Sequence, residues 1–230
     1  MVATTQNTKL NPYNPFTEEH TMFRKTVRSF VEKELVPYVE KWEEERIAPL
    51  HDIFKKMGNL GFLGLNYPVD YGGAEADIWF TVVFAEELAR SGVGGVPMAV
   101  FVQTDMATPA LAKHGSNALK EKYLAPAIRG EMVCAIAVTE PDAGSDVAGI
   151  TTRAEQDGDH YVINGSKMYI TNGTQADWLC LLARTSPGEG YQGMSLIVVP
   201  TDSDGFSVSK KLKKLGNYSS DTAVLSFENV

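Results

Sequence analysis

Two short segments place polar side chains and glycine directly after apolar runs, and they are the residues best suited to chemistry. One reads Val-Thr-Glu-Pro-Asp-Ala-Gly-Ser-Asp over residues 138–146, and the other reads Lys-Met-Tyr-Ile-Thr-Asn-Gly over residues 167–173. Successive N–H groups in such turns form concave sites for anions and carbonyl oxygens, and glycine lets a ligand approach the backbone closely. Clusters of Ser, Gly, Asp and Pro are more often plain turns, so either segment alone favours a turn.

The sequence contains none of the common motifs for nucleotide, metal or thiol chemistry. It has no G-x-G-x-x-G after a strand, no phosphate loop ending in Gly-Lys-Ser/Thr, no His-Glu-x-x-His and no Cys-x-x-Cys. The histidines at positions 20, 51, 114 and 160 lack the spacing of metal ligands. We therefore expect no metal site.

The composition is that of an ordinary folded protein, with 43% hydrophobic and 22% charged residues. The net charge of −8 argues against nucleic acid as the main partner, because phosphate binding needs a basic surface. Cys134 and Cys180 each lie in an apolar run, which predicts free core thiols and a reducing, cytoplasmic compartment. No apolar run reaches the ~18 residues of a membrane span, and the N-terminus does not resemble a signal peptide.

In the first half of the chain, apolar residues recur every three or four positions, which is the spacing of one helix face. The first such stretch runs from Thr17, the expected N-cap, to Trp42, and Pro37 is expected to kink or split it. In a later helix that begins after Asp77, the spacing places Ile78 on the inward face. The further helices are expected from Pro49 to about Gly58 or Gly61, from Asp77 to Gly92, from Pro97 to Lys113 and from Asn117 to Ile128.

After Glu131 the sequence changes to short β-rich runs separated by turn residues. The expected strands cover residues 132–139, 151–155, 161–164, 168–171, 178–183, 195–200 and 223–227. Asp157-Gly158 and Asn164-Gly165 are expected in hairpin turns, because such turns require positive φ. Strands without interleaved helices predict a mainly antiparallel sheet or barrel. The expected fold is therefore α+β, with an all-helical domain over residues 1–130 and a β-domain over residues 131–230.

The two segments occur together in the order and separation found in the acyl-CoA dehydrogenase family, which this sequence strongly resembles. Members carry V-T-E-P-x-A-G-S-D-V and, further along the chain, K-x-W/Y/F-I-T-N-G. The resemblance covers nearly the whole chain and includes Tyr71-Gly72-Gly73, Tyr123-Leu124-Ala125-Pro126, Lys214-Leu215-Gly216 and Ser220-Asp221-Thr222-Ala223. It implies FAD-dependent α,β-dehydrogenation of an acyl-CoA, with electrons passed to an electron-transfer flavoprotein, in a homo-oligomer (dimer or tetramer).

The resemblance also implies which residues contact the flavin. They are Ile136, Ala137, Val138, Thr139, Gly144, Ser145, Tyr169, Ile170 and Thr171. Val138 and Thr139 would meet the pyrimidine edge of the isoalloxazine, and Ser145 would lie by the pyrophosphate and also touch the acyl-CoA. Tyr169 replaces the family's usual Trp against the flavin face, and Thr171 would bond near N5, the hydride acceptor. Fixed donors near N1 and O2 favour hydride acceptance, because negative charge accumulates there.

In this family a Glu of a C-terminal helical bundle removes the α-proton, and no carboxylate of this sequence matches its position. The chain ends at Val230, so we expect a chain truncated before that bundle and assign no catalytic residue. Glu140 is interpreted as structural. The segment from Gly95 to Leu111 resembles the branch that handles branched or terpenoid acyl-CoAs. The alternatives are a flavin oxidase or monooxygenase on the same scaffold and a non-catalytic flavin or acyl-CoA binding fragment; DNA binding is disfavoured by the charge.

Overall fold

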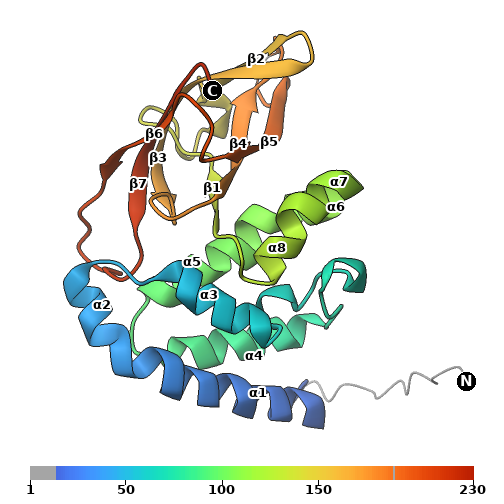
Figure 1. The fold of residues 1–230 in the computed structure, drawn as a ribbon, viewed down its shortest axis with the longest axis vertical. Coiled ribbons are helices and arrows are strands. Elements are labelled where there is room, and N and C mark those ends of the chain that lie inside the picture. The colour runs from blue at the N-terminus through green and yellow to red at the C-terminus, as the bar shows by residue number, and fades with distance from the viewer. Residues whose placement is uncertain (1–13, 189) are drawn as a thin grey trace, which may run out of the picture.

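The computed structural model describes residues 14–188 and 190–230, which form a helical part followed by a curled sheet (Figure 1). The α-helices are α1 (Glu18–Phe30), α2 (Val39–Glu45), α3 (Leu50–Asn59), α4 (Ile78–Ala89), α5 (Gly95–Phe101), α6 (Thr108–His114), α7 (Asn117–Leu119) and α8 (Ala125–Ile128). The strands are β1 (Cys134–Ala137), β2 (Arg153–Asp157), β3 (His160–Thr171), β4 (Trp178–Arg184), β5 (Met194–Pro200), β6 (Phe206–Lys211) and β7 (Thr222–Glu228). The predicted α+β class is confirmed.

The first helical region begins and breaks where the sequence predicts. The Thr17 side chain accepts a hydrogen bond from His20 N, so Thr17 caps α1. Pro37 has no N–H to donate to a helical ladder. The chain accordingly passes through a π turn (Val31–Leu35) and a 3-10 turn (Val36–Tyr38) before α2 begins. The long amphipathic stretch is thus split rather than continuous.

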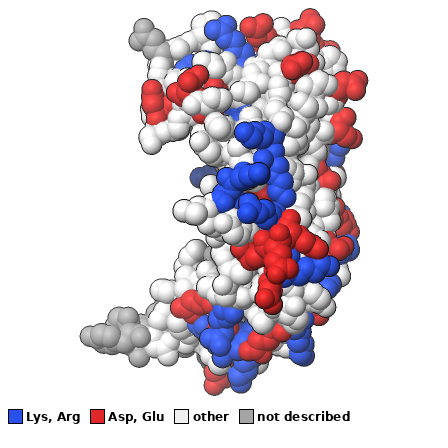
Figure 2. Space-filling view, turned by 90° about the vertical axis from the view of Figure 1, so that its left-hand side faces the viewer, with Lys and Arg blue, Asp and Glu red and all other residues white. Residues whose placement is uncertain are grey.

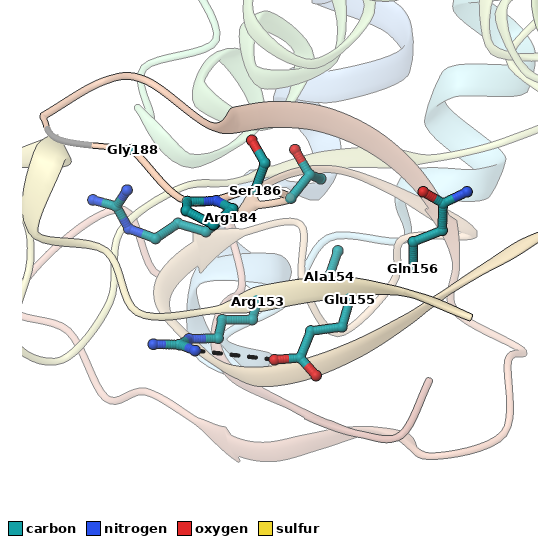
Figure 3. Close-up of a pocket in the computed structure, with 9 residues that line it drawn as sticks. Arg153, Ala154, Glu155, Gln156, Arg184, Ser186 and Gly188 are labelled. Carbon is teal, nitrogen blue, oxygen red and sulfur yellow. Dashed lines mark ion pairs between the residues drawn. The ribbon is translucent and has the colours of Figure 1, made fainter. Parts of the chain in front are cut away.

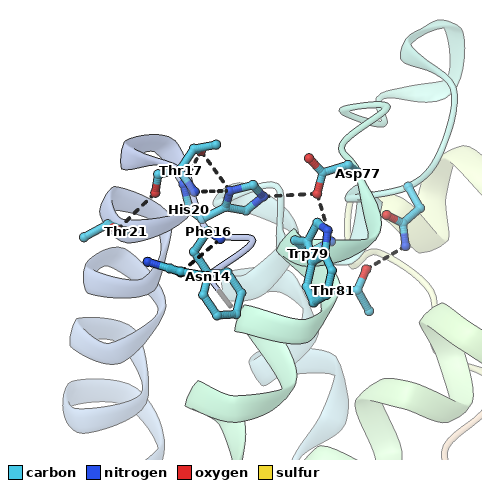
Figure 4. A network of polar contacts seen from close by, with 9 residues as sticks. Asn14, Phe16, Thr17, His20, Thr21, Asp77, Trp79 and Thr81 are labelled. Atoms are coloured by element: carbon cyan, nitrogen blue, oxygen red, sulfur yellow. Dashed lines mark hydrogen bonds and ion pairs between the residues drawn. The ribbon is translucent and has the colours of Figure 1, made fainter. Parts of the chain in front are cut away.

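A buried histidine joins the starts of α1 and α4 (Figure 4). His20 Nδ1 accepts from Thr17 N at 3.0 Å, and His20 Nε2 lies 3.1 Å from Asp77 Oδ1. Because Nδ1 is an acceptor, Nε2 carries the hydrogen and donates to Asp77. The same Asp77 oxygen accepts from Trp79 N at 2.8 Å and so caps α4. The two helix starts therefore share one polar network.

One residue of α4 that was predicted to face inward lies on the surface. Ile78 is 62% exposed, whereas Val83, Phe84 and Leu88 form the buried face. The first half of α4 is almost entirely apolar, so the sequence spacing alone does not select the inward face. Packing against α1 selects it instead.

The sheet is mainly antiparallel, as predicted, but it contains two parallel pairings. Its order is β1-β4-β2-β3-β7-β6, and β5 pairs with β4. The β2/β3, β3/β7, β4/β5 and β6/β7 pairs are antiparallel, whereas β1 and β2 both run parallel to β4. A separate apolar cluster, which includes Leu124, Cys134 and Trp178, joins the sheet to the helices. Cys134 and Cys180 are free and buried in this cluster, as the sequence predicts.

The predicted hairpin turn at Asn164-Gly165 is wrong, because β3 continues through it. Gly165 pairs with Phe227 of β7. A Cβ at Gly165, whose φ is 149°, would lie 2.5 Å from Thr152 Oγ1. Close approach of a neighbouring chain segment, rather than a turn, therefore requires glycine here. Asp157-Gly158 does lie at the turn between β2 and β3, as predicted.

The sequence does not predict β6, because this strand is almost entirely exposed and only Phe206 is partly buried. Beyond β6 the chain lies against α2. The Glu43 carboxylate accepts hydrogen bonds from Tyr218 N at 3.1 Å and Ser219 N at 2.8 Å. Figure 2 shows acidic side chains gathered beside basic ones on the face that contains α2 and the end of β6. Opposite charges thus meet where the helical part joins the sheet.

Candidate functional site

Strand β1 ends the sheet order, so one of its edges has no neighbouring strand. At the start of this edge, Cys134 N donates to Gln103 Oε1 at 2.9 Å, and Cys134 O accepts from Asn172 Nδ2 at 3.2 Å. Just beyond the other end, Val138 O accepts from Lys167 Nζ at 2.8 Å. Side chains from other elements therefore occupy both ends of the free edge.

The backbone of Ile136 faces the same free edge. N–H and C=O groups of a strand alternate between its two edges with a period of two. Cys134 and Val138 both bond to side chains outside the sheet, so Ile136, midway between them, points the same way. Between the two occupied ends, the edge presents Ile136 N–H, Ile136 C=O and Val138 N–H. This donor–acceptor–donor order is complementary to an imide, whose edge reads carbonyl, N–H, carbonyl.

Strand β3 brings the second segment to the end of β1 through a bulge. The β3/β7 register shifts between Lys167 and Ile170, and Met168 N donates to Thr139 O at 2.8 Å. Tyr169, within the bulge, has a φ of 61° and a side chain that is 62% exposed. A bulky residue with positive φ is a conformational outlier, and such outliers cluster at functional sites. The bulge leaves Tyr169 without a partner on β7 and its aromatic ring exposed, next to the end of β1.

A buried ion pair lies behind the two segments. Lys167 Nζ lies 2.8 Å from Glu140 Oε1, and the two side chains are 0% and 4% exposed. The Glu140 carboxylate also accepts from Thr151 N at 2.6 Å, Thr151 Oγ1 at 2.8 Å and Thr152 N at 3.0 Å. Burial would raise the pKa of Glu140, but these donors outweigh it and lower the pKa to about 2. Burial lowers the pKa of Lys167, and Glu140 opposes that shift.

The predicted site residues fall into four groups in the structure. The backbones of Ile136, Val138 and Thr139 run along or just beyond the free edge, and the bulged Tyr169 lies beside them. Ala137 and Ile170 are buried in the sheet core, so only their backbone atoms can reach a ligand. Thr171 is half-buried at the end of β3. Gly144 and Ser145 are exposed in the turn that follows Glu140.

Three functional side chains were not assigned from the sequence: Gln103, Asn172 and Lys167. All three are buried, and each bonds to the backbone of β1 or of Val138 just beyond it. Asn172 Nδ2 also donates to Ala99 O of α5 at 2.9 Å and so ties helix to sheet. Lys167 opens the segment 167–173 that the sequence singled out, but its acceptor lies 29 residues away, so the sequence alone did not indicate this contact.

Two pockets of the molecule lie elsewhere. A cavity of about 530 Å³ is lined by residues of β2, the end of β4 and the following loop (Figure 3). There Arg184 Nε donates to Ile150 O at 3.0 Å, and Arg153 pairs loosely with Glu155 at 4.0 Å. A second cavity, of about 480 Å³, lies between α6, α7 and strands β4 and β5. The predicted site residues line neither cavity, so the candidate site is an open strand edge.

Within residues 14–188 and 190–230, no three His, Cys, Asp or Glu side chains are grouped closely enough to hold a metal ion. No helix of the same residues has the length and apolar character needed to cross a membrane.

Comparison with known proteins identifies close relatives over almost the whole chain. Residues 17–131 match the family model for the acyl-CoA dehydrogenase N-terminal domain, and residues 135–230 match that for the middle domain. Isovaleryl-CoA dehydrogenase of Pongo abelii is 37% identical over 94% of this chain and 52% of its own length. The chain spans about half the length of the curated relatives it matches.

Solved structures give the same result. An acyl-CoA dehydrogenase from Geobacillus kaustophilus has a TM-score of 0.88 at 41% identity, over 93% of this chain and 56% of that one. A glutaryl-CoA dehydrogenase from Mycobacterium smegmatis, solved in complex with FADH2, has a TM-score of 0.86 at 33% identity, over 94% of this chain and 54% of that one.

Proposed function

This chain belongs to the acyl-CoA dehydrogenase family, and we propose that it forms the flavin-binding part of an enzyme that oxidises an acyl-CoA between its α and β carbons. In this proposal, residues 1–130 are a helical domain and residues 131–230 a β-domain that binds FAD. The acyl-CoA is the substrate, and an electron-transfer flavoprotein accepts the electrons. We also propose a cytoplasmic homo-oligomer.

The free edge of β1 is the observation that carries this proposal. The pyrimidine ring of FAD has an imide edge, C4=O, N3–H, C2=O, which complements the donor–acceptor–donor order at Ile136 and Val138. Thr139 follows Val138 at the end of this edge, and the bulged, exposed Tyr169 offers an aromatic surface beside it. FAD bound here would accept the hydride that leaves the β-carbon. The residues of this chain bind the ring, orient it and exclude water from its edge.

Two site roles are proposed from the family motif. Thr171, at the end of β3, is placed near N5, and Ser145, in the exposed turn, is placed by the pyrophosphate and the acyl-CoA. We assign no base to this chain. Glu140 is unsuited to that role, because it is buried, bonded to Lys167 and two threonines, and has a pKa of about 2.

Hydrogen exchange on the protein as encoded by its gene tests the flavin site. The amides of Ile136 and Val138 should exchange fast after FAD is removed and slowly once FAD is restored. The amides of Ala135 and Ala137, which point toward β4, should be protected in both states and serve as controls. If FAD fails to rebind, or rebinds without protecting Ile136 and Val138, this site assignment is wrong. Bleaching of the flavin by an acyl-CoA series then tests the reaction.

A further inference from the structure

We propose that Lys167 is a positioning residue for the flavin, which sets the register of the ring along β1 by occupying the Val138 carbonyl. The inference rests on the proposed flavin-binding function and adds a role that the family motif did not supply. The Lys167 side chain is fully buried, and its Nζ donates to Val138 O at 2.8 Å.

The ammonium group has little freedom to leave this carbonyl. Glu140, its ion-pair partner at 2.8 Å, is itself held by backbone and hydroxyl donors from Thr151 and Thr152. The Glu140 backbone is fixed as well, because its N donates to Ala143 O at 2.9 Å and its O accepts from Ala143 N at 3.3 Å. Lys167 is thus anchored by a network that does not depend on a ligand.

Because the neighbouring backbone groups are already hydrogen-bonded, an imide can bind at only one position along the edge. A ring shifted toward the start of β1 would need the N–H and C=O of Cys134, which are bonded to Gln103 and Asn172. A ring shifted the other way would need the carbonyl of Val138, which Lys167 occupies, and the N–H of Glu140, which is bonded to Ala143. Only Ile136 N–H, Ile136 C=O and Val138 N–H remain. Lys167 thus prevents the ring from shifting toward Glu140.

A role in stability alone does not account for this arrangement. Replacing a buried ion pair by apolar side chains of similar volume is often neutral or stabilising, so such a pair is weak evidence for stability. A carbonyl at the end of an exposed edge can be hydrogen-bonded by water without any buried charge. What the ammonium adds is a fixed donor that excludes the imide N–H of the ring from Val138 O.

A charge-neutral double variant tests the proposal. Lys167→Met with Glu140→Gln removes both charges together and approximately conserves volume. We expect the ring to bind in more than one register along β1, because the Val138 carbonyl becomes free to accept its imide N–H, and this should change the visible spectrum and midpoint potential of bound FAD. The matched control is Glu87→Gln, which removes the charge of a buried carboxylate that pairs with Arg28 at 2.7 Å in the helical part. It should lower the melting temperature and leave the spectrum, affinity and potential of bound FAD unchanged.

A second measurement needs no variant and remains decisive if the double variant does not fold. In wild-type protein carrying ¹³C=¹⁸O at one carbonyl, FAD binding should shift the infrared band of Ile136 and leave that of Val138 unchanged. A shifted Val138 band, or a folded double variant whose bound FAD has the wild-type spectrum and potential, overturns the role of Lys167. Failure of the wild-type protein to bind FAD would instead refute the proposed function, so the two failures are distinguishable.

Discussion

At the scale of single residues, the site depends on charged and polar groups placed where water cannot solvate them. Lys167 is completely buried and Glu140 nearly so, and each has the other as its ion-pair partner. An intact pair of this kind adds little net stability, whereas loss of one partner leaves an uncompensated buried charge. The pair therefore tolerates joint replacement far better than replacement of one member.

We predict that Glu140→Gln lowers the free energy of unfolding by about 3–5 kcal/mol at pH 7. The folded-state pKa of Glu140, about 2, lies below its ordinary value of 4.5. The stability it contributes is therefore present above pH 4.5 and is lost as pH falls toward 2. Urea denaturation at a series of pH values from 7 to 3 gives the free energy of unfolding of each protein. The values for wild type and variant should converge as the pH falls.

Glu131→Gln is the control for this experiment. Hydrogen bonds from Arg129 and Lys55 lower the pKa of Glu131 to about 2 as well, but this carboxylate lies on the surface. Because solvent screens ion pairs on the surface, loss of the Glu131 charge should change the free energy of unfolding far less. If the difference in unfolding free energy between wild type and Glu140→Gln does not change with pH, Glu140 is not an ionised, stabilising carboxylate.

Thr171→Val should slow reduction of the flavin by acyl-CoA more than it weakens retention of FAD. The hydroxyl is proposed to act near N5, and loss of one buried hydrogen bond is worth roughly 1–3 kcal/mol. Stopped-flow reduction and FAD dissociation measure the two effects separately. Thr222→Val, on the β7 residue paired with Thr171, is the control for disturbance of the sheet. Equal reduction rates in wild type and Thr171→Val would remove Thr171 from the mechanism.

At the scale of elements, irregular positions tie the helices and strands together. Asn172, with a φ of 67°, ends β3 and reaches both α5 and β1 with its amide nitrogen. The bulge at Tyr169 leaves this residue without a partner on β7 and its aromatic ring exposed. Among the helices, His20 joins two helix starts by accepting at one nitrogen and donating at the other. These contacts fix how the elements lie relative to one another, which the spacing of apolar residues in the sequence does not determine.

The junction of α1 and α4 can be tested at Asp77. Asp77→Ala removes both the cap of Trp79 N and the acceptor for His20, and we expect a loss of about 1–2 kcal/mol in unfolding free energy. Asp77→Asn keeps an oxygen that can accept both bonds, so we expect this variant to lose clearly less unfolding free energy than Asp77→Ala. Thermal and urea unfolding measure the difference. If the two variants are equally destabilised, the negative charge rather than the cap matters.

At the scale of the whole molecule, the helical part and the sheet are fastened by side chains that cross between them. Gln175 Oε1 accepts from Leu50 N at 3.1 Å, at the start of α3. Hydrogen bonds of three further side chains also connect the helical part to the second half of the chain: those of Gln103, Asn172 and Glu43. The free edge of β1 lies at this junction, because Gln103 and Asn172 both bond to its first residue, Cys134.

We predict that residues 1–230 expressed alone, with FAD and an acyl-CoA series added, do not bleach the flavin at an enzymatic rate. The chain matches the N-terminal and middle domain models, and the family resemblance places the catalytic Glu in neither. A positioned base contributes roughly 10²–10⁴-fold in rate. Turnover at the rate of a complete family member would show that a base lies within these residues.

Local chemistry determined much of this protein from the sequence. Thr17, Pro37 and Asp77 act on their own helices through caps and missing donors, so the helix boundaries were predictable. The β-rich second half followed from composition and turn residues. The segments at 138–146 and 167–173 indicated the family and directed attention to the end of β1, since both motifs are continuous in sequence.

Only the tertiary structure decided which groups meet at that edge. Gln103, Asn172 and Lys167 come from different elements, and their bonds to β1 and Val138 depend on how sheet and helices pack. Gly165 likewise resembles a turn residue in sequence, but Thr152 of another segment explains it. The parallel pairing of β1 with β4 leaves the other edge free, and strand order is a property of the whole sheet. Such contacts join residues far apart in the chain, so no local pattern encodes them.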